Sequence, residues 1–475
     1  MRKNFFYNIT FSIANILFPI ISFPYASRIL GPAGIGKVQM AFSLAQYFSL
    51  IAALGVPVYG IQKIAKVKLD RTKLYITLSE LFILNSIASL LISGIYLCMI
   101  LALPFFATST AFYLIAGLMI VFGAMNIDWF YSGLENFRMI TLRSVCIKLM
   151  ALFALYGFVK KESDYVYYLL ITLFAYLGNC VWGFVPYVKK INFKWEDLDF
   201  KQHIKPLVYI LCTMIVASVY TMLDTVFLGF FSCDTAVGFY TAATKLTRIV
   251  IPVITAFGTV LIPSFAKSFE QKNDSKIQEL IDTSFNIIIS LAVPACIGLF
   301  LLSNEFILVF SGEKFSQASV TMKILSVLPL IVGIGHLFVF QLMAPAERNK
   351  EMFWSAIIGT IVFVVLNLIL VPAFSEKGEA VVAVVTEIIV SISYYYFLRK
   401  TVLFKLNKKL IVEALISAVF FVPFIMWIQS FHLEAWLTLI ESVSVCIVWY
   451  IGIQIWVFKN VFLTEQYIHI RNKFF

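Results

Sequence analysis

Two cations stand close together inside an apolar stretch in the second half of the chain. Lys245 and Arg248 are three residues apart, so they share one face of a helix, and Pro252 follows one turn later. Two positive charges at membrane depth are costly unless an anion or a carboxylate meets them. The guanidinium of Arg248 suits two-point capture of phosphate oxygens. The pair therefore predicts either a site for an anionic, phosphate-bearing ligand or an ion pair with an acid such as Asp224.

A third cation of this kind is Arg28. It follows Pro19 and Pro24, whose missing N–H groups predict a bend in the first helix that leaves carbonyl groups lining a cavity. Arg28 would then join the phosphate-binding cations. The alternative is that its side chain extends to the lipid headgroups at the membrane surface, and the sequence does not separate these interpretations.

Acidic residues in apolar segments predict either ion-coupling and gating sites or structural pairs with nearby cations. Asp128 and Glu135 are seven residues apart, which places them on one helical face, and Arg143 and Lys148 of the next helix are their expected partners. Glu387 lies in the middle of an apolar helix with no cation nearby in the sequence. It is a candidate carrier of a proton or a sodium ion, or alternatively a hydrogen-bonding group between two helices.

The composition of the chain indicates that these charged residues lie in a membrane protein. The chain of 475 residues is 61% apolar and 13% charged, and its mean hydropathy is +0.91. Runs of roughly 20 apolar residues span a bilayer as helices, whereas barrel strands would alternate in polarity. The sequence predicts an all-α polytopic membrane protein with fourteen spans, at about 8–30, 37–61, 74–103, 108–131, 140–159, 165–187, 206–231, 238–264, 283–303, 318–343, 352–372, 378–398, 410–430 and 435–458.

The basic residues orient these spans. With the N-terminus in the cytoplasm, the inner loops and termini carry 28 of the 37 Lys and Arg residues. Positive residues favour the cytoplasmic side, so both termini are expected there. The net charge of +11 is spread over short loops, which indicates contact with anionic lipids rather than binding of nucleic acid. The first apolar run lacks a cleavage site and is read as an uncleaved first helix.

A repeat divides the chain nearly in half. A Leu-Gly step, a glycine-containing turn, an apolar helix and an Ala-Lys exit occur from Leu30 to Lys66 and again from Leu228 to Lys267. The glycines Gly36 and Gly238 occupy matching places in the two copies. Two similar bundles facing each other are typical of alternating access, with the substrate held between them. We expect bundles at 1–190 and 200–400, followed by two extra helices and a cytoplasmic tail at 408–475.

Other chemistry is not indicated. No glycine-rich phosphate loop ending in Gly-Lys-Ser or Gly-Lys-Thr is present, so ATP hydrolysis by that route is not expected. The seven cysteines are scattered without metal-binding spacing, so neither a metal nor a cofactor is predicted. The energy for transport would then come from a coupling ion, Na⁺ or H⁺, from the substrate gradient or from a partner.

Several segments resemble the polysaccharide repeat-unit flippases, the Wzx-type O-antigen and capsule transporters. These segments are FPYASRILGPAGIGKVQMAFSLAQYFSLIAALGVPVYGIQKIAK (23–66), IDWFYSGLENFRMITLRSVCIK (127–148), LDTVFLGFF and VGFYTAATKL (within 223–246), and the run from Gln341 through Asn367 and Pro372 to Glu387. They are spread over most of the chain, from residue 23 to residue 387, in the family's order. The resemblance implies the superfamily of multidrug, oligosaccharidyl-lipid and polysaccharide exporters.

That superfamily has two pseudo-symmetric six-helix bundles, here with two C-terminal helices. The implied substrate is an oligosaccharide on undecaprenyl pyrophosphate, moved from the cytoplasmic to the outer leaflet of a bacterial cytoplasmic membrane for surface polysaccharide assembly. Polysaccharide polymerase and glycosyltransferases are the implied partners. No enzymatic activity is expected.

The chain departs from the family at two places. Gln62-Lys63 stands where members often have Arg-Glu, and Thr225 where they often have Lys after the Asp, which leaves Asp224 freer to meet Lys245 or Arg248. Two other functions stay open. A lipid II flippase would share the fold, and a multidrug cation antiporter would too, although its cavity should be acidic rather than basic.

Overall fold

The structure is a computed structural model that describes residues 2–191, 198–400, 404–460 and 462–464. Every regular element in these ranges is a helix, as the apolar runs predict. Within the described residues, eleven helices are long and apolar enough to cross a membrane. The chain is therefore a multi-pass helical membrane protein.

The expected count of fourteen spans is not confirmed. The long helix α15 (Asn349–Arg399) takes in two of the expected spans, and α1 (Arg2–Ala52) takes in one and most of the next, whose end falls in α2 (Val56–Val67). The expected span 206–231 is divided between α8 (Lys201–Met222) and α9 (Asp224–Phe231).

Each of the two long helices contains one residue that is not helical. In α1 this residue is Gly31, with φ 68°, and in α15 it is Ser375, with φ 51°. Glycine has no Cβ, so Gly31 adopts this positive φ without a steric clash. The break in α1 thus falls at Gly31 and not at Pro19 or Pro24, where we expected the helix to open, because a proline removes one backbone donor but keeps a helical φ.

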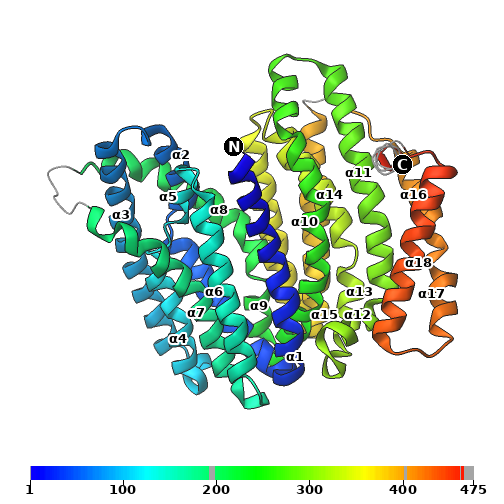
Figure 1. Ribbon diagram of the computed structural model, residues 1–475, viewed down its shortest axis with the longest axis horizontal. Helices are drawn as coiled ribbons and strands as arrows, with labels where there is room; N and C mark the ends of the chain where they lie inside the picture. Colours follow the sequence, from blue (N-terminus) through cyan, green and yellow to red (C-terminus); the bar gives the residue numbers. More distant parts are fainter. Residues whose placement is uncertain (1, 192–197, 401–403, 461, 465–475) are drawn as a thin grey trace. The chain divides into compact units, whose positions relative to one another are not determined.

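The chain forms two compact units, Met1–Gly238 and Phe239–Phe475. The expected three-part division at 1–190, 200–400 and 408–475 stays a prediction. Besides α1, α8 and α9, the helices of the first unit are α2 (Val56–Val67), α3 (Arg71–Ala102), α4 (Thr110–Gly123), α5 (Asp128–Gly133), α6 (Phe137–Phe158) and α7 (Tyr165–Phe184). Helices α3, α4, α6 and α7 run side by side (Figure 1).

A buried apolar cluster in the first unit gathers residues of α2, α3, α5 and neighbouring helices. Leu74, Leu78 and Leu81 repeat on one face of α3 and pack with Trp129 and Phe130 of α5. Inside a membrane such contacts stabilise by close packing, since lipid tails are as apolar as leucine. This packing fixes the start of α5, where Asp128 lies.

The second unit holds α10 (Asp234–Glu270), which begins in the last residues of the first unit, and the helices after it. These are α11 (Asp274–Leu301), α12 (Ser303–Ser311), α13 (Ala318–Leu325), α14 (Leu328–His336), the π-helix η6 (Leu337–Met343), α15, α16 (Lys408–Val419), α17 (Phe421–Gln429) and α18 (Ala435–Trp456). In Figure 1 the orange and red helices α16 to α18 lie beside α11.

Hydrogen bonds fix the last helices to this bundle. The side-chain amide of Asn460 donates to Asn286 Oδ1 and Ser290 Oγ of α11, at 2.9 and 3.0 Å, and to Gln454 Oε1 of α18 at 3.2 Å. Gln454 in turn donates to Ser417 Oγ of α16 at 3.0 Å. Polar bonds of this kind give the docking a single register, which apolar packing in lipid alone does not.

Candidate functional site

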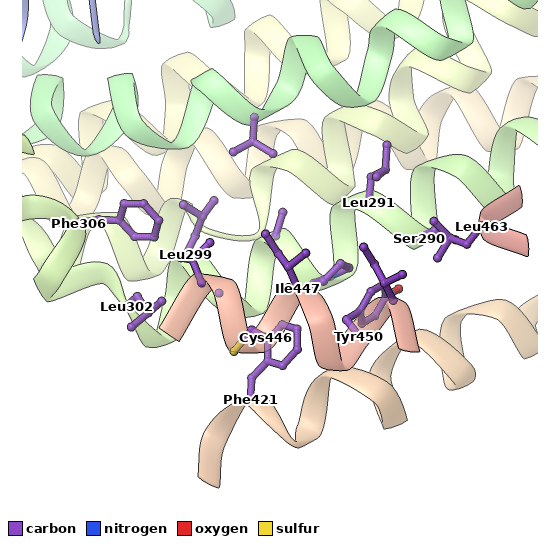
Figure 2. A pocket seen from close by; sticks show the side chains of 16 residues that line it. Ser290, Leu291, Leu299, Leu302, Phe306, Phe421, Cys446, Ile447, Tyr450 and Leu463 are labelled. Atoms are coloured by element: carbon purple, nitrogen blue, oxygen red, sulfur yellow. The ribbon is translucent and has the colours of Figure 1, made fainter. Parts of the chain in front are cut away.

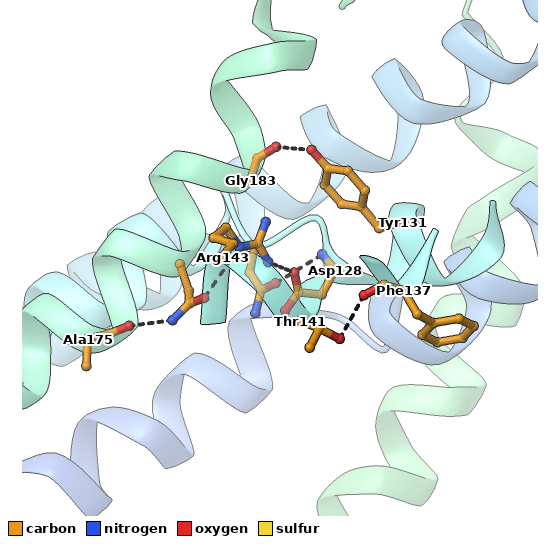
Figure 3. A network of polar contacts seen from close by, with 9 residues as sticks. Asp128, Tyr131, Phe137, Thr141, Arg143, Ala175 and Gly183 are labelled. Atoms are coloured by element: carbon orange, nitrogen blue, oxygen red, sulfur yellow. Dashed lines mark hydrogen bonds and ion pairs between the residues drawn. The ribbon is translucent and has the colours of Figure 1, made fainter. Parts of the chain in front are cut away.

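A buried ion pair joins α5 to α6 in the first unit. Asp128 is the first residue of α5 and Arg143 lies on α6, and the guanidinium donates to the carboxylate (Figure 3). Only 4% of the Arg143 side chain is exposed, against 40% for Asp128. A charge held this far from water needs a lasting partner, so Asp128 keeps Arg143 in place while one side of its own carboxylate stays reachable.

Helix α7 closes the other side of Arg143. The Nε of Arg143 donates to Asn179 Oδ1 at 3.4 Å, and its guanidinium carbon lies 5.6 Å from the centre of the Tyr131 ring. Tyr131 donates its hydroxyl to the carbonyl of Gly183 at 2.8 Å (Figure 3). A methyl group on Gly183 would overlap the guanidinium. The glycine is therefore what lets Arg143 lie against α7.

Glu135 and Lys148 do not join this pair, contrary to our expectation. Helix α5 ends at Gly133 and Glu135 lies beyond it with φ 57°, so it does not share a helical face with Asp128. Its carboxylate instead accepts a hydrogen bond from Lys68 at 2.7 Å. That hydrogen bond, together with the charge of Lys68, holds the pKa of Glu135 below its ordinary value. Lys148 donates to Asn15 Oδ1 of α1.

The cations of the second unit lie on α10. Lys245 is half-buried and Arg248 is exposed on the protein surface. Arg248 interacts electrostatically with Glu387 of α15. Glu387, which has no cation nearby in the sequence, thus meets one across two helices. Lys245 lies three residues before Arg248 on the same helix, and the binding role expected for these cations stays a prediction.

Arg28 and Asp224 belong to the first unit. Arg28 is exposed and lies three residues before the break at Gly31. Asp224 is buried at the first position of α9, where its Oδ1 accepts from the backbone N–H of Thr225 at 2.7 Å and from the Thr225 hydroxyl at 3.2 Å. A carboxylate is favoured at a helix N-terminus. Pairing of Asp224 with Lys245 or Arg248 stays a prediction.

One buried polar group escaped the sequence analysis. Glu80 of α3 accepts a hydrogen bond from His203 of α8 at 2.8 Å, and both are buried. Tyr59 of α2 lies 2.9 Å from the other ring nitrogen of His203, and the N–H of Asp199 donates to Glu80 at 2.7 Å. Glu80 is an acid within an apolar helix, which is the same signal that singled out Glu387. Its partner is distant in sequence and could not be read from it.

An apolar cavity of about 420 Å³ lies within the second unit. Leu299 of α11 and Phe306 of α12 line one part of it, while Cys446, Ile447 and Tyr450 come from α18 (Figure 2). The hydroxyl of Ser290 at its edge is already hydrogen-bonded to Asn286 and Asn460. The cavity therefore suits hydrocarbon.

These features define a class. A chain whose described part consists of apolar, membrane-length helices with charged pairs between them is a polytopic membrane protein. The structure is similar to that of the lipid II flippase MurJ in an inward closed conformation, with a TM-score of 0.76 and 14% identity over 96% of this chain and 100% of that chain. It is also similar to an inward-facing multidrug resistance MATE family transporter, with a TM-score of 0.65 and 14% identity over 81% of this chain and 94% of that one.

The chain belongs to the polysaccharide biosynthesis protein family, whose model matches residues 1–269. A second model, described as lipid II flippase MurJ, matches residues 173–447. A protein of Shigella dysenteriae named "Putative O-antigen transporter" is 23% identical over 82% of this chain and 98% of its own length. The protein of the same name from Escherichia coli strain K12 is 22% identical over 87% of this chain and 98% of its own. The resemblance seen in the sequence is confirmed.

Proposed function

We propose that this protein is a flippase that moves lipid-linked oligosaccharide repeat units across the cytoplasmic membrane by alternating access, for assembly of a surface polysaccharide. The observation that carries the proposal is the match to proteins named as O-antigen transporters over 98% of their length. The substrate would be a glycan on undecaprenyl pyrophosphate. The relatives are transporters, and the proposed role needs no bond to be made or broken.

The charged residues support an anionic substrate. Lys245 and Arg248 are the cations that would bind the pyrophosphate, with Arg28 as a third. Glu387 offsets the charge of Arg248, so the second unit can hold its cations before substrate arrives. A pyrophosphate that binds Arg248 in place of Glu387 would link substrate binding to the ionisation of Glu387.

The apolar cavity of the second unit supports a lipid-linked substrate. We propose that it accepts part of the polyprenyl chain, because its lining is apolar apart from a few groups such as the Tyr450 hydroxyl, and its edge serine is already hydrogen-bonded. The pyrophosphate and sugar would then occupy polar surroundings elsewhere.

The proposed orientation follows from the basic residues. With 28 of 37 on one side, that side faces the cytoplasm and both termini lie there. Anionic lipids would contact these loops, and glycosyltransferases and a polymerase would act before and after the flipping step.

A second candidate is lipid II, favoured by the match of residues 173–447 to the MurJ model. Lipid II also carries a pyrophosphate and a polyprenyl chain, so only the sugar separates the two. The test compares them directly in vesicles containing the purified protein, one set with a fluorescent undecaprenyl-pyrophosphate repeat unit and one with fluorescent lipid II. Faster movement of lipid II than of the repeat unit would contradict the first proposal.

The same vesicles test the cations. Lys245→Ala and Arg248→Ala should abolish flipping and leave membrane abundance normal, and Arg28→Ala should weaken it. Lys267→Ala is the matched control, because Lys267 is an exposed lysine in the last turn of the same helix. Full activity of the Lys245→Ala, Arg248→Ala double variant would refute pyrophosphate binding at this site.

The cavity has its own test. Gly298 lines it, and a Cβ there would meet no atom within 4 Å, so Gly298→Leu has room to begin a side chain that fills part of the cavity. Gly157 of α6 is equally open and is not among the residues that line the cavity, which makes Gly157→Leu the control. Flipping should fall for Gly298→Leu alone. Equal activity of the two variants would remove the cavity from the proposal.

A further inference from the structure

The two copies of the sequence repeat meet at their glycines, within the first unit. Gly36 follows the break at Gly31 in α1, and Gly238 follows the non-helical Ser232 that precedes α10. A methyl group on Gly36 would overlap the carbonyl oxygen of Asp234 and would come within 2.8 Å of the backbone nitrogen of Gly238.

The contact is reciprocal. A methyl group on Gly238 would overlap the carbonyl oxygen of Pro32. Pro32 precedes Gly36 by four residues, and Asp234 precedes Gly238 by four residues. Each glycine therefore faces the carbonyl group that lies one helical turn before the other glycine. This reciprocal pattern is that of a two-fold contact. We call Pro32, Gly36, Asp234 and Gly238 the glycine seam.

A charge pair lies beside the seam. Lys37, next to Gly36, interacts electrostatically with Asp234. The ammonium group of Lys37 lies 4.9 Å from the ring centre of Tyr165 on α7 and 5.6 Å from that of Phe112 on α4. The rings position the lysine, and the lysine attracts the start of α10.

We propose that the glycine seam closes one end of the substrate route and separates once in every transport cycle. The inference rests on the proposed transport function. In transporters built from repeats, equivalent elements of the two repeats move against each other. A glycine Cα–H against a carbonyl oxygen gains at most a weak interaction, so parting two backbones that meet in this way costs little. Each helix start follows a non-helical residue that can act as a hinge. In the proposed orientation the seam faces the outside.

A buried reporter measures opening of the seam. Ala236 lies between Asp234 and Gly238 and is 4% exposed. In a protein whose native cysteines are replaced, Ala236→Cys should react slowly with a thiol reagent. The purified protein is placed in nanodiscs, where the reagent reaches both faces, so the measurement depends neither on orientation nor on substrate.

Gly36→Ala and Gly238→Ala should each raise the labelling rate of this cysteine about tenfold or more, because the added methyl group forces the helix starts apart. Gly34→Ala is the matched control. A Cβ at Gly34 lies 3.1 Å from Leu30 Cβ of the same helix and 3.7 Å from Tyr165 Cβ, so it leaves the seam alone. The double variant Gly36→Ala, Gly238→Ala should label less than the two separate effects combined, since one gap accommodates both methyl groups.

Asp234→Asn adds no atom to the backbone contact and removes the charge attraction to Lys37, so it tests the seam without a new methyl group. It should raise labelling by a smaller factor. Labelling of all these variants at the rate of Gly34→Ala would overturn the proposal. Raised labelling in a protein that moves neither glycan would uphold the seam and refute the proposed substrate.

Discussion

Gly183→Ala should destabilise the protein although alanine is the better helix former. Glycine-to-alanine changes inside a helix gain about 1 kcal/mol on propensity alone. At Gly183 the new methyl group would overlap the guanidinium of Arg143 and push it away from Asp128. Breaking a buried ion pair costs about 3–5 kcal/mol. Because 40% of the Asp128 side chain is exposed, we reduce that cost to about 2–3 kcal/mol. The net loss is then about 1–2 kcal/mol.

The control lies on the same helix. A Cβ at Gly178 would make ordinary contacts of 3.4–3.7 Å with Ile147, so Gly178→Ala should gain close to the full propensity term. The two variants should thus differ by about 2–3 kcal/mol, which thermal unfolding of the purified protein in detergent resolves as a separation of several degrees. A Gly183→Ala protein as stable as Gly178→Ala would refute the reasoning.

A second control removes the Asp128–Arg143 ion pair before Gly183 is changed. In an Asp128→Ala, Arg143→Met background the guanidinium is gone, so Gly183→Ala should no longer destabilise. A penalty that persists in this background would show that the methyl group clashes with something other than Arg143, and the double-mutant comparison measures the difference directly.

Three further outcomes are expected. Glu387→Gln should still bind the lipid-linked glycan but move it slowly, with a blunted response to pH or sodium gradients in vesicles, and an unchanged ion response would exclude Glu387 from coupling. The Lys68–Glu135 link should hold at neutral pH and be lost as the pH falls through the lowered pKa of Glu135, below 4.5. Acid titration of wild type against Glu135→Gln should then show their stabilities converging, and a gap that persists in acid would contradict the assignment. Single cysteines should react with an impermeant reagent on intact cells at 104–108, 160–164 and 431–434 but not at 66–73.

Much of the fold could be read from the sequence because apolar runs of membrane-spanning length have few alternatives to a helix. The positions at which the helices break were harder to predict. Pro24 suggested an opening, whereas the left-handed residue is Gly31, since a proline fits a helical φ and glycine alone tolerates the positive one without cost. The prediction for Glu135 was wrong because it assumed one continuous helix from Asp128 to Glu135. Helix α5 is only about one and a half turns long and ends at Gly133.

The site was read less completely, because its contacts cross helices that are far apart in the chain. Arg143 could be matched with Asp128 since their helices are consecutive. Glu387 and Arg248 are separated by several helices, and so are Glu80 and His203. Spacing reports which residues share one helix, but it carries no information on which helix lies opposite. Gly36 and Gly238 show this limit. Their matching positions in the two repeats could be read from the sequence, whereas their contact could not.

The hydrogen bonds of Asn460 have a consequence for biogenesis. Helices enter the membrane in chain order, so Asn286, Ser290 and Ser417 are inserted before Gln454 and Asn460 are made. Until then, their polar groups stand in hydrocarbon or bond within their own helices. The bundle of α11, α16 and α18 is therefore completed late in synthesis, and a ribosome that stalls before residue 460 leaves a protein whose spans are inserted but whose last helices are not yet locked to the others.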